Sequence, residues 1–145
     1  MRITLQRVSQ ACCRVDGQIT GEISSGLVAL VGFTASDRSE MLPLAAKKCL
    51  ELRIFPDEQG KLNRSLLDNQ GAILLISQFT LYANCTRGRR PDFTHAAPPE
   101  QAKRLYLELI KVFTDLGFPP QTGIFAADMQ LSLVNEGPIT INLEW

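Results

Sequence analysis

The feature that most constrains the fold is a short apolar run, Ala72–Ile76, which ends abruptly in polar residues. A continuous run rich in branched side chains is typical of a strand covered on both faces. Ser77, Gln78 and Thr80 follow it, which places neutral hydrogen-bonding groups at the edge of a rigid element. A binding or catalytic site is held most accurately in such a place. The alternative is an ordinary strand end whose polar groups cap the following loop.

Other hydrophobic patterns indicate the fold class. Leu27–Phe33 is a second continuous apolar run and predicts a central strand. Asp16-Gly17 is typical of a tight hairpin turn. Residues 57–71 and 83–99 are predicted to be loops. Three segments alternate apolar and polar residues, as half-buried strands do: Ile3–Val8, Met129–Val134 and Ile139–Trp145.

Two helices are expected. Asp37 and Glu40 have the spacing of a capping box, and Pro43 favours a slightly later start for the first helix. Its expected buried face is Met41, Ala45, Cys49 and Leu52. Pro98 and Pro99 open the second helix, and Gly117 ends it. Its expected buried stripe is Ala102, Leu105, Leu109, Val112, Phe113 and Leu116.

About seven strands, two helices and hairpin signals near both ends predict a mixed or largely antiparallel α/β fold rather than a doubly wound one. The chain has 145 residues, the size of one domain, predicted to span residues 1–145. No apolar run reaches membrane-spanning length and no signal sequence is evident. We therefore expect a cytoplasmic protein that does not contact membranes.

The composition argues against several kinds of chemistry. His95 is the only histidine, and the four cysteines lack metal-binding spacing, so neither a metal site nor a cofactor is expected. A serine or cysteine nucleophile needs a positioned base, and His95 lies in a predicted loop. Cys85 is expected to be a spectator. The formal net charge is zero, so any contact with nucleic acid must come from a local patch.

Two motifs, taken together, point to a family. Ser77–Ala83 reads SQFTLYA, and Asn135–Thr140 reads NEGPIT. With LQRV at residues 5–8, GRRPDF at 88–93 and AAPPE at 96–100, they resemble the D-aminoacyl-tRNA deacylase family, also called D-tyrosyl-tRNA deacylase. The resemblance covers almost the whole chain. It implies strands in two layers, two helices on one outer face, and a homodimer as the working unit.

The resemblance implies hydrolysis of the ester that joins a D-amino acid to the 3′ end of tRNA. An activated ester needs mainly positioning and hydrogen bonds to the developing oxyanion. The expected donors are the backbone N–H groups of Phe79 and Thr80. Thr80, Gln78 and Ser77 are the expected catalytic side chains, whether they act chemically or position water and the ribose. The 2′-hydroxyl of the substrate is a further candidate participant.

Chirality is the second implication. A clash rejects the wrong enantiomer better than a lost contact does. In the family, a Gly-cisPro unit enters the pocket of the partner subunit, and the matching residues here are Gly137 and Pro138. Arg7 is expected to brace them, the alternative being a surface charge at a strand end. Phe79, Phe125 and Met129 are expected to line the pocket, the alternative being plain core. Glycyl-tRNA is a further candidate substrate, because glycine has no side chain to exclude.

Contact with tRNA is expected at an arginine cluster. Arg87, Arg89 and Arg90 surround Gly88, and arginine binds phosphate in a bidentate manner. Such a cluster is also typical of a solvated loop. The chain departs from the family pattern twice: residues 84–88 read NCTRG where Asp-Thr-Arg-Lys-Gly is usual, and Ala126 stands where glycine is usual. These departures weaken the tRNA contact and leave the range of amino acids open.

Two other classes of function compete with the deacylase. One is a non-catalytic RNA-binding module that uses the Arg87–Arg90 loop. The other is a thiol or threonine hydrolase of small metabolites. Comparing D- and L-tyrosyl-tRNA in one assay separates them, because only the deacylase predicts enantioselective turnover.

Overall fold

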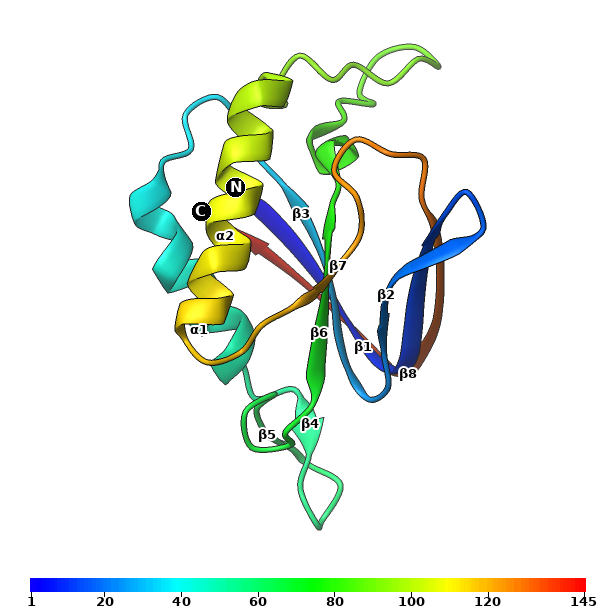
Figure 1. Ribbon diagram of the computed structural model, residues 1–145, viewed down its shortest axis with the longest axis vertical. Coiled ribbons are helices and arrows are strands. Elements are labelled where there is room, and N and C mark those ends of the chain that lie inside the picture. Colours follow the sequence, from blue (N-terminus) through cyan, green and yellow to red (C-terminus); the bar gives the residue numbers. More distant parts are fainter.

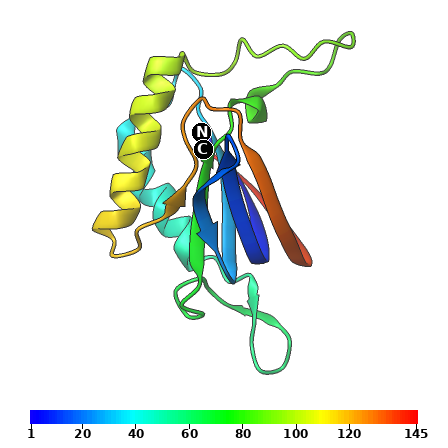
Figure 2. The same cartoon turned by 45° about the vertical axis from the view of Figure 1, so that its right-hand side comes forward.

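The computed structural model describes residues 1–145 and contains one main sheet with both α-helices on the same side of it (Figures 1 and 2). The strand order is β2-β1-β3-β6-β7, and β8 also pairs with β1. The strands are β1 (Arg2–Val15), β2 (Gln18–Ile23), β3 (Gly26–Gly32), β6 (Ala72–Ser77), β7 (Gln121–Thr122) and β8 (Gln130–Glu144). A separate two-stranded sheet consists of β4 (Phe55–Pro56) and β5 (Leu62–Arg64). β5 lies within residues 57–71, which were expected to be a loop, and β4 comes just before them.

Most strand pairs are antiparallel, as expected. β1 runs antiparallel to β2, β3 and β8, whereas the pairs β3–β6 and β6–β7 are parallel. The two continuous apolar runs are the adjacent central strands β3 and β6, which agrees with their burial on both faces. The prediction of a mixed, largely antiparallel α/β fold with two helices on one outer face is confirmed.

The helices cover one face of the sheet with apolar side chains. α1 (Leu42–Glu51) begins just ahead of Pro43, and α2 (Pro99–Asp115) begins at a proline, as expected. Their buried residues are Leu42, Ala45, Ala46, Cys49 and Leu50 on α1, and Leu105, Tyr106, Leu109 and Phe113 on α2. Each large apolar side chain buried in this way contributes roughly 1.5–3 kcal/mol. The expected burial of Leu116 is wrong, because this residue lies beyond the last turn of α2 and is half exposed.

The expected capping box does not form. Asp37 is buried, and its carboxylate accepts hydrogen bonds from the Met1 ammonium (2.6 Å) and from the Thr34 N–H (2.9 Å). A short 3₁₀ turn, η1 (Ser39–Met41), precedes α1 and has no side-chain cap. The Asp37 carboxylate therefore binds the Met1 ammonium, 36 positions away, and does not cap α1, which its spacing from Glu40 does not reveal.

A second core lies on the other face of the sheet. The far half of β1 and strand β2 curl over β3 and β6, and seven buried residues meet there: Val8, Ala11, Cys13, Ile23, Val28, Leu74 and Ile76. β2 comes so close to β7 that a Cβ on Gly21 would lie 2.6 Å from the Thr122 carbonyl oxygen. The sheet thus curls most of the way towards a barrel, and Gly21 permits the close approach of its edges.

The NEGPIT segment contains Asn, Gly and Pro, which alone are typical of a hairpin turn between the two segments predicted as strands. In the structure it is instead a bulge within one strand, β8. Residues 130–135 and 140–144 of β8 both pair with β1, and the register shifts between them. Residues 136–139 stand opposite Arg7 alone, so they are pushed out of the ladder. No residue of β8 is fully buried. No helix of the chain is both long enough and apolar enough to cross a membrane.

Candidate active site

The expected catalytic motif forms a tight turn at the end of β6. Ser77 is the last residue of β6 and is half buried. The Gln78 N–H donates to the Val31 carbonyl (2.7 Å), which continues the sheet by one residue. The chain then enters the 3₁₀ turn η2 (Phe79–Tyr82). Because the strand beneath is rigid and buried, the turn is held in a fixed position.

Close packing against β3 also fixes this turn. A Cβ on Gly32 would lie 2.8 Å from the Gln78 carbonyl oxygen, so only glycine allows η2 to sit over the end of β3. Arg2 secures the far side of the turn: its Nη1 donates to the Leu81 carbonyl (2.9 Å), and its guanidinium lies 4.7 Å from the centre of the Tyr82 ring. The expectations from the sequence missed Arg2, because nothing in its neighbourhood along the chain relates it to residue 81.

The turn presents donors and a hydroxyl to solvent. The first N–H groups of a helical turn have no acceptor within it. Hydrogen bonding in η2 begins at Leu81, whose N–H donates to the Gln78 carbonyl (3.3 Å), so the N–H groups of Phe79 and Thr80 precede it. Phe79 and Thr80 are exposed, and the Gln78 side-chain amide donates to the Thr80 hydroxyl oxygen. The three expected catalytic residues are therefore gathered at one strand end.

The titratable groups packed near this turn are shifted away from neutral pH. Burial, with a further contribution from Asp37, raises the pKa of the Tyr82 hydroxyl to about 12. Burial also raises the pKa of the Tyr106 hydroxyl, which donates to the Leu75 carbonyl (2.7 Å) below the turn. Both phenols are protonated at neutral pH, so each holds structure and neither is available as a base.

A loop carrying two expected lining residues runs beside η2 in both views (Figures 1 and 2). Phe125 is half buried, and its ring centre lies 5.9 Å from that of Tyr106. Met129 packs against the second core, and its sulfur would lie 2.4 Å from a Cβ on Gly123. Ala126 has a φ of 62°, the left-handed region that favours glycine. This explains in physical terms why glycine suits that position.

Arg7 is not a surface charge, and that alternative is wrong. It is only 6% exposed, and its Nη1 donates to the Ile54 carbonyl (2.6 Å). Its Nε lies 3.7 Å from the Glu136 carboxylate, and a Cβ on Gly137 would lie 2.9 Å from its Nη2. The Arg7 side chain thus packs directly against the bulge of β8. The Gly137-Pro138 bond is cis, as expected, and both residues are exposed.

The bulge lies partway along β1, well away from the end of the sheet that carries η2. Arg2 pairs with Gly32 beside η2, whereas Arg7 pairs with Leu27. Arg7 follows Arg2 by five positions along the extended strand β1, which corresponds to a distance of roughly 16 Å. Within one chain, therefore, Gly137 and Pro138 are not brought to Phe79 and Thr80.

The arginine cluster lies on a projecting hairpin above η2 (Figures 1 and 2). Asn84 and Asp92 close its base through two backbone hydrogen bonds of 2.7 and 3.0 Å. The tip arginines Arg87, Arg89 and Arg90 are exposed and form no ion pair. Cys85 and His95 are also exposed on this connection.

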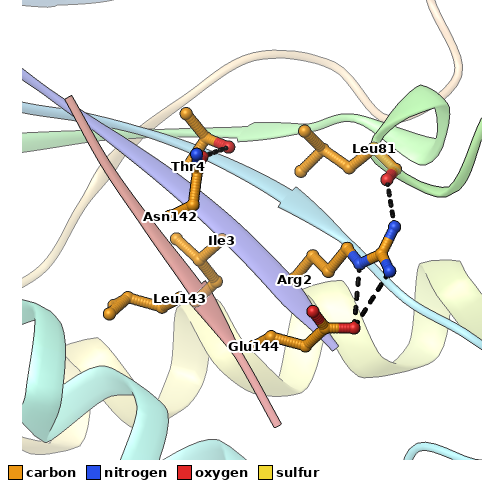
Figure 3. Close-up of a pocket in the computed structure, with 7 residues that line it drawn as sticks. All are labelled: Arg2, Ile3, Thr4, Leu81, Asn142, Leu143 and Glu144. Atoms are coloured by element: carbon orange, nitrogen blue, oxygen red, sulfur yellow. Dashed lines mark hydrogen bonds and ion pairs between the residues drawn. The ribbon is translucent and has the colours of Figure 1, made fainter.

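A shallow pocket of about 300 Å³ adjoins η2 on the sheet face away from the helices (Figure 3). Arg2 crosses it between Leu81 and Glu144, and Thr4 donates to the Asn142 side chain (2.8 Å). Its charged groups are already paired with each other. The pocket therefore lacks free polar groups converging on a ligand, and the exposed turn beside it is the better candidate.

Comparisons with known proteins agree with the geometry. The profile of the family described as D-Tyr-tRNA(Tyr) deacylase matches residues 4–144. The chain is 49% identical to the D-aminoacyl-tRNA deacylase of Geotalea uraniireducens and 50% identical to that of Listeria innocua, over 99% of this chain and 93% and 96% of those proteins.

Solved structures show the same fold. One, described as c-Myc DNA Unwinding Element Binding Protein, has a TM-score of 0.93 and 36% identity over 100% of this chain and 99% of that one. Another, described as a probable eukaryotic D-amino acid tRNA deacylase, has a TM-score of 0.86 and 17% identity over 98% and 97% of the two chains, and at that identity it supports the fold alone. With the family profile matching nearly every residue, the chain belongs to the D-Tyr-tRNA(Tyr) deacylase family of hydrolases.

Proposed function

We propose that this protein hydrolyses the ester bond of D-aminoacyl-tRNA, releasing the free D-amino acid and tRNA. The observation that carries the proposal is the exposed turn η2, where two backbone N–H groups precede the first hydrogen bond of the turn and the side chain of Thr80 is exposed. Relatives about 50% identical to this chain are named D-aminoacyl-tRNA deacylases.

The chemistry requires little beyond positioning. A water oxygen attacks the carbonyl carbon of the ester, and negative charge develops on the carbonyl oxygen. The Phe79 and Thr80 N–H groups are suited to donate to that oxygen, since fixed donors stabilise such charge without reorganising. The C–O bond to the ribose then breaks, the ribose oxygen takes up one proton of the attacking water, the other proton passes to solvent, and the D-amino acid is released with a free carboxylate.

Thr80 and Gln78 have positioning roles in this scheme. The Gln78 amide donates to the Thr80 hydroxyl oxygen, which leaves the hydroxyl proton free to point at the substrate or at water. Ser77 anchors the turn at the end of β6. Because the aminoacyl ester is activated, correct orientation of water and carbonyl supplies much of the rate enhancement.

The separation of η2 from the β8 bulge supports a homodimer. In one chain the bulge lies roughly 16 Å along β1 from η2, so the proposed contact between them requires a second copy. β8 is a 15-residue strand without a fully buried residue, and its outer edge is unpaired. A long open edge of this kind is usually covered in the working protein. In the proposed dimer, Gly137 and Pro138 of one subunit border the turn of the other.

Enantiomer selection follows from this arrangement as part of the proposal. Arg7, held by the Ile54 carbonyl and by Glu136, supports the bulge from behind and keeps its backbone in place. A rigid backbone wall excludes an L side chain by collision, which discriminates more strongly than a missing contact. Glycyl-tRNA, without a side chain, passes the same wall and is a second substrate. Phe125 and Met129 line the loop beside the turn.

The arginine hairpin is the proposed contact with tRNA. Arg87, Arg89 and Arg90 have no acidic partner, so they are available for phosphates. A hairpin that projects above η2 can follow the RNA backbone while the 3′ end enters the site (Figure 1). RNA binding without catalysis is the second candidate function, favoured by this hairpin alone.

The test is a side-by-side assay of D- and L-tyrosyl-tRNA with the purified protein. Release of tyrosine from the D substrate, with much slower release from the L substrate, is the expected result. Retention of both charged tRNAs despite measurable binding would support the RNA-binding module. Equal turnover of both would contradict selection by the bulge.

A further inference from the structure

An exposed aromatic pair lies between the proposed reaction site and the arginine hairpin. Phe79 of η2 is 57% exposed and Phe93, just past the hairpin base, is 37% exposed. Their ring centres lie 5.1 Å apart with an interplanar angle of 67°, an edge-to-face pair. In such a pair the partner covers at most one ring face, and both side chains still expose area on which a flat ligand could bind.

The surroundings hold Phe93 in place. Asn84 and Asp92 close the hairpin immediately before it, and the Asp92 carboxylate accepts hydrogen bonds from the Thr94 N–H (3.0 Å) and hydroxyl (2.9 Å). These bonds lower the pKa of the Asp92 carboxyl, so it is ionised at neutral pH. The pairing of Asn84 with Asp92 and the two hydrogen bonds to the Asp92 carboxylate thus restrain the backbone on either side of Phe93. This rigidity reduces the entropy lost when a ligand binds.

The charge beside the pair indicates what kind of ligand fits. Three arginines without acidic partners stand on the adjacent hairpin, and Thr80 follows Phe79 directly. Open aromatic faces next to unpaired cationic side chains are the usual means of binding single-stranded nucleic acid, with bases on the rings and phosphates on the charges. A protein partner that docked an apolar patch on the aromatic pair would leave the three arginines without negative partners, unless that partner were also acidic.

We propose that Phe79 and Phe93 form a stacking platform for an unpaired nucleobase at the 3′ end of the RNA substrate. The inference rests on the proposed function and adds a residue to it, Phe93, as a binding residue that recognises the single-stranded end. Base stacking tolerates any sequence, because every base has a π face. The platform thus selects an unpaired end rather than a particular tRNA, while the arginines bind the phosphates behind it.

The test is binding of two RNA hairpins that share one stem, one ending in a four-nucleotide single-stranded 3′ overhang and one blunt. For the unmodified protein, tighter binding of the overhang hairpin is expected. Phe93→Ala should weaken binding of the overhang hairpin about tenfold and leave the blunt hairpin unchanged. Phe93→Tyr keeps an open ring and should retain the preference. Arg89→Ala should weaken both hairpins to a similar extent.

A matched control is Leu44→Ala on α1, which removes another exposed apolar side chain (59% exposed) far from the hairpin and should change neither affinity. Equal binding of the two hairpins to the unmodified protein would refute the stacking platform. So would equal losses of affinity for both hairpins in Phe93→Ala. A Phe93→Ala variant that changes its oligomeric state but keeps the overhang preference would also refute it. Failure of the proposed function looks different: D-tyrosyl-tRNA would stay charged even where the overhang preference persists.

Discussion

At the scale of single residues, the reaction proposed for the exposed turn after β6 relies on hydrogen-bond donors and not on a side chain that gains or loses a proton. In the proposed site, Phe79 and Thr80 supply backbone N–H groups to the oxyanion, and the Gln78 amide donates to the Thr80 hydroxyl oxygen. The two buried tyrosines nearby are kept protonated. A site of this kind should lose activity through misplaced donors, and it should show little dependence on pH from its own side chains.

The first residue-scale prediction concerns Thr80. Thr80→Ala should lower kcat on D-tyrosyl-tRNA roughly 10- to 100-fold with a similar fall in kcat/KM, because the lost hydroxyl acts mainly in the transition state. Thr80 is exposed, so the thermal unfolding midpoint should hardly change. Single-turnover hydrolysis and a melting curve are the measurements, and Thr80→Ser, which keeps the hydroxyl, is the control. Full activity in Thr80→Ala would remove this residue from the scheme.

The second prediction separates the cysteines. Cys12, Cys13 and Cys49 are buried and Cys85 is exposed, and burial raises the pKa of the Cys49 thiol to about 12. A thiol reagent should therefore label Cys85 alone in the native protein and all four thiols after unfolding. Cys85→Ala should abolish native labelling but leave most deacylation intact, as should His95→Ala. Strong loss of activity in either variant would mean that the chemistry is misassigned.

At the scale of elements, α2 supports the strand that carries the turn. The Tyr106 hydroxyl donates to the Leu75 carbonyl two residues before Ser77, and that bond is buried. Tyr106→Phe should lower the free energy of unfolding by about 1 kcal/mol, because a buried acceptor loses its donor. Chemical denaturation measures this directly. Tyr82→Phe, whose hydroxyl makes no hydrogen bond to protein, is the matched control and should cost less.

The bulge of β8 is the second element with a testable role. Pro138→Ala changes the exposed wall that is proposed to exclude L substrates, and it leaves η2 untouched. The expected result is a higher rate on L-tyrosyl-tRNA relative to D-tyrosyl-tRNA, with activity on the D substrate largely kept. The ratio of the two kcat/KM values is the measurement. Loss of both activities together would assign Pro138 to folding or to the reaction itself.

The same two elements show how far sequence patterns reach. The run Ala72–Ile76 and its polar end predicted β6 and the turn correctly, because a continuous apolar run and the polar residues that follow it are neighbours in the sequence. The bulge looked like a hairpin turn, because Asn, Gly and Pro form both. Only the pairing of both flanks with β1 distinguishes the two, and that pairing joins residues more than 110 positions apart. The contact of Asp37 with the Met1 ammonium was missed for a similar reason, because 36 positions separate the two residues.

At the scale of the whole molecule, the proposed composite site makes a prediction about mixed dimers. In a dimer with one Thr80→Ala subunit and one Pro138→Ala subunit, one site combines both changes and the other combines neither. Selective hydrolysis of the D substrate should therefore reappear at about half the unmodified rate. If each chain instead held a complete site of its own, the mixture would retain only the unselective site. Differently tagged, co-purified subunits assayed on both enantiomers decide between these outcomes.

The bulge of β8 has a consequence for how such proteins diverge. Its flanks, residues 130–135 and 140–144, are each fastened to β1 by their own ladder. Insertions or deletions between them need not disturb either ladder, since the register on each side is set independently. The sheet thus acts as a fixed frame around a replaceable segment. Related proteins can therefore differ in the length and sequence of this segment, and with it in the proposed exclusion of substrates, while the pairing of β1 with β8 stays the same.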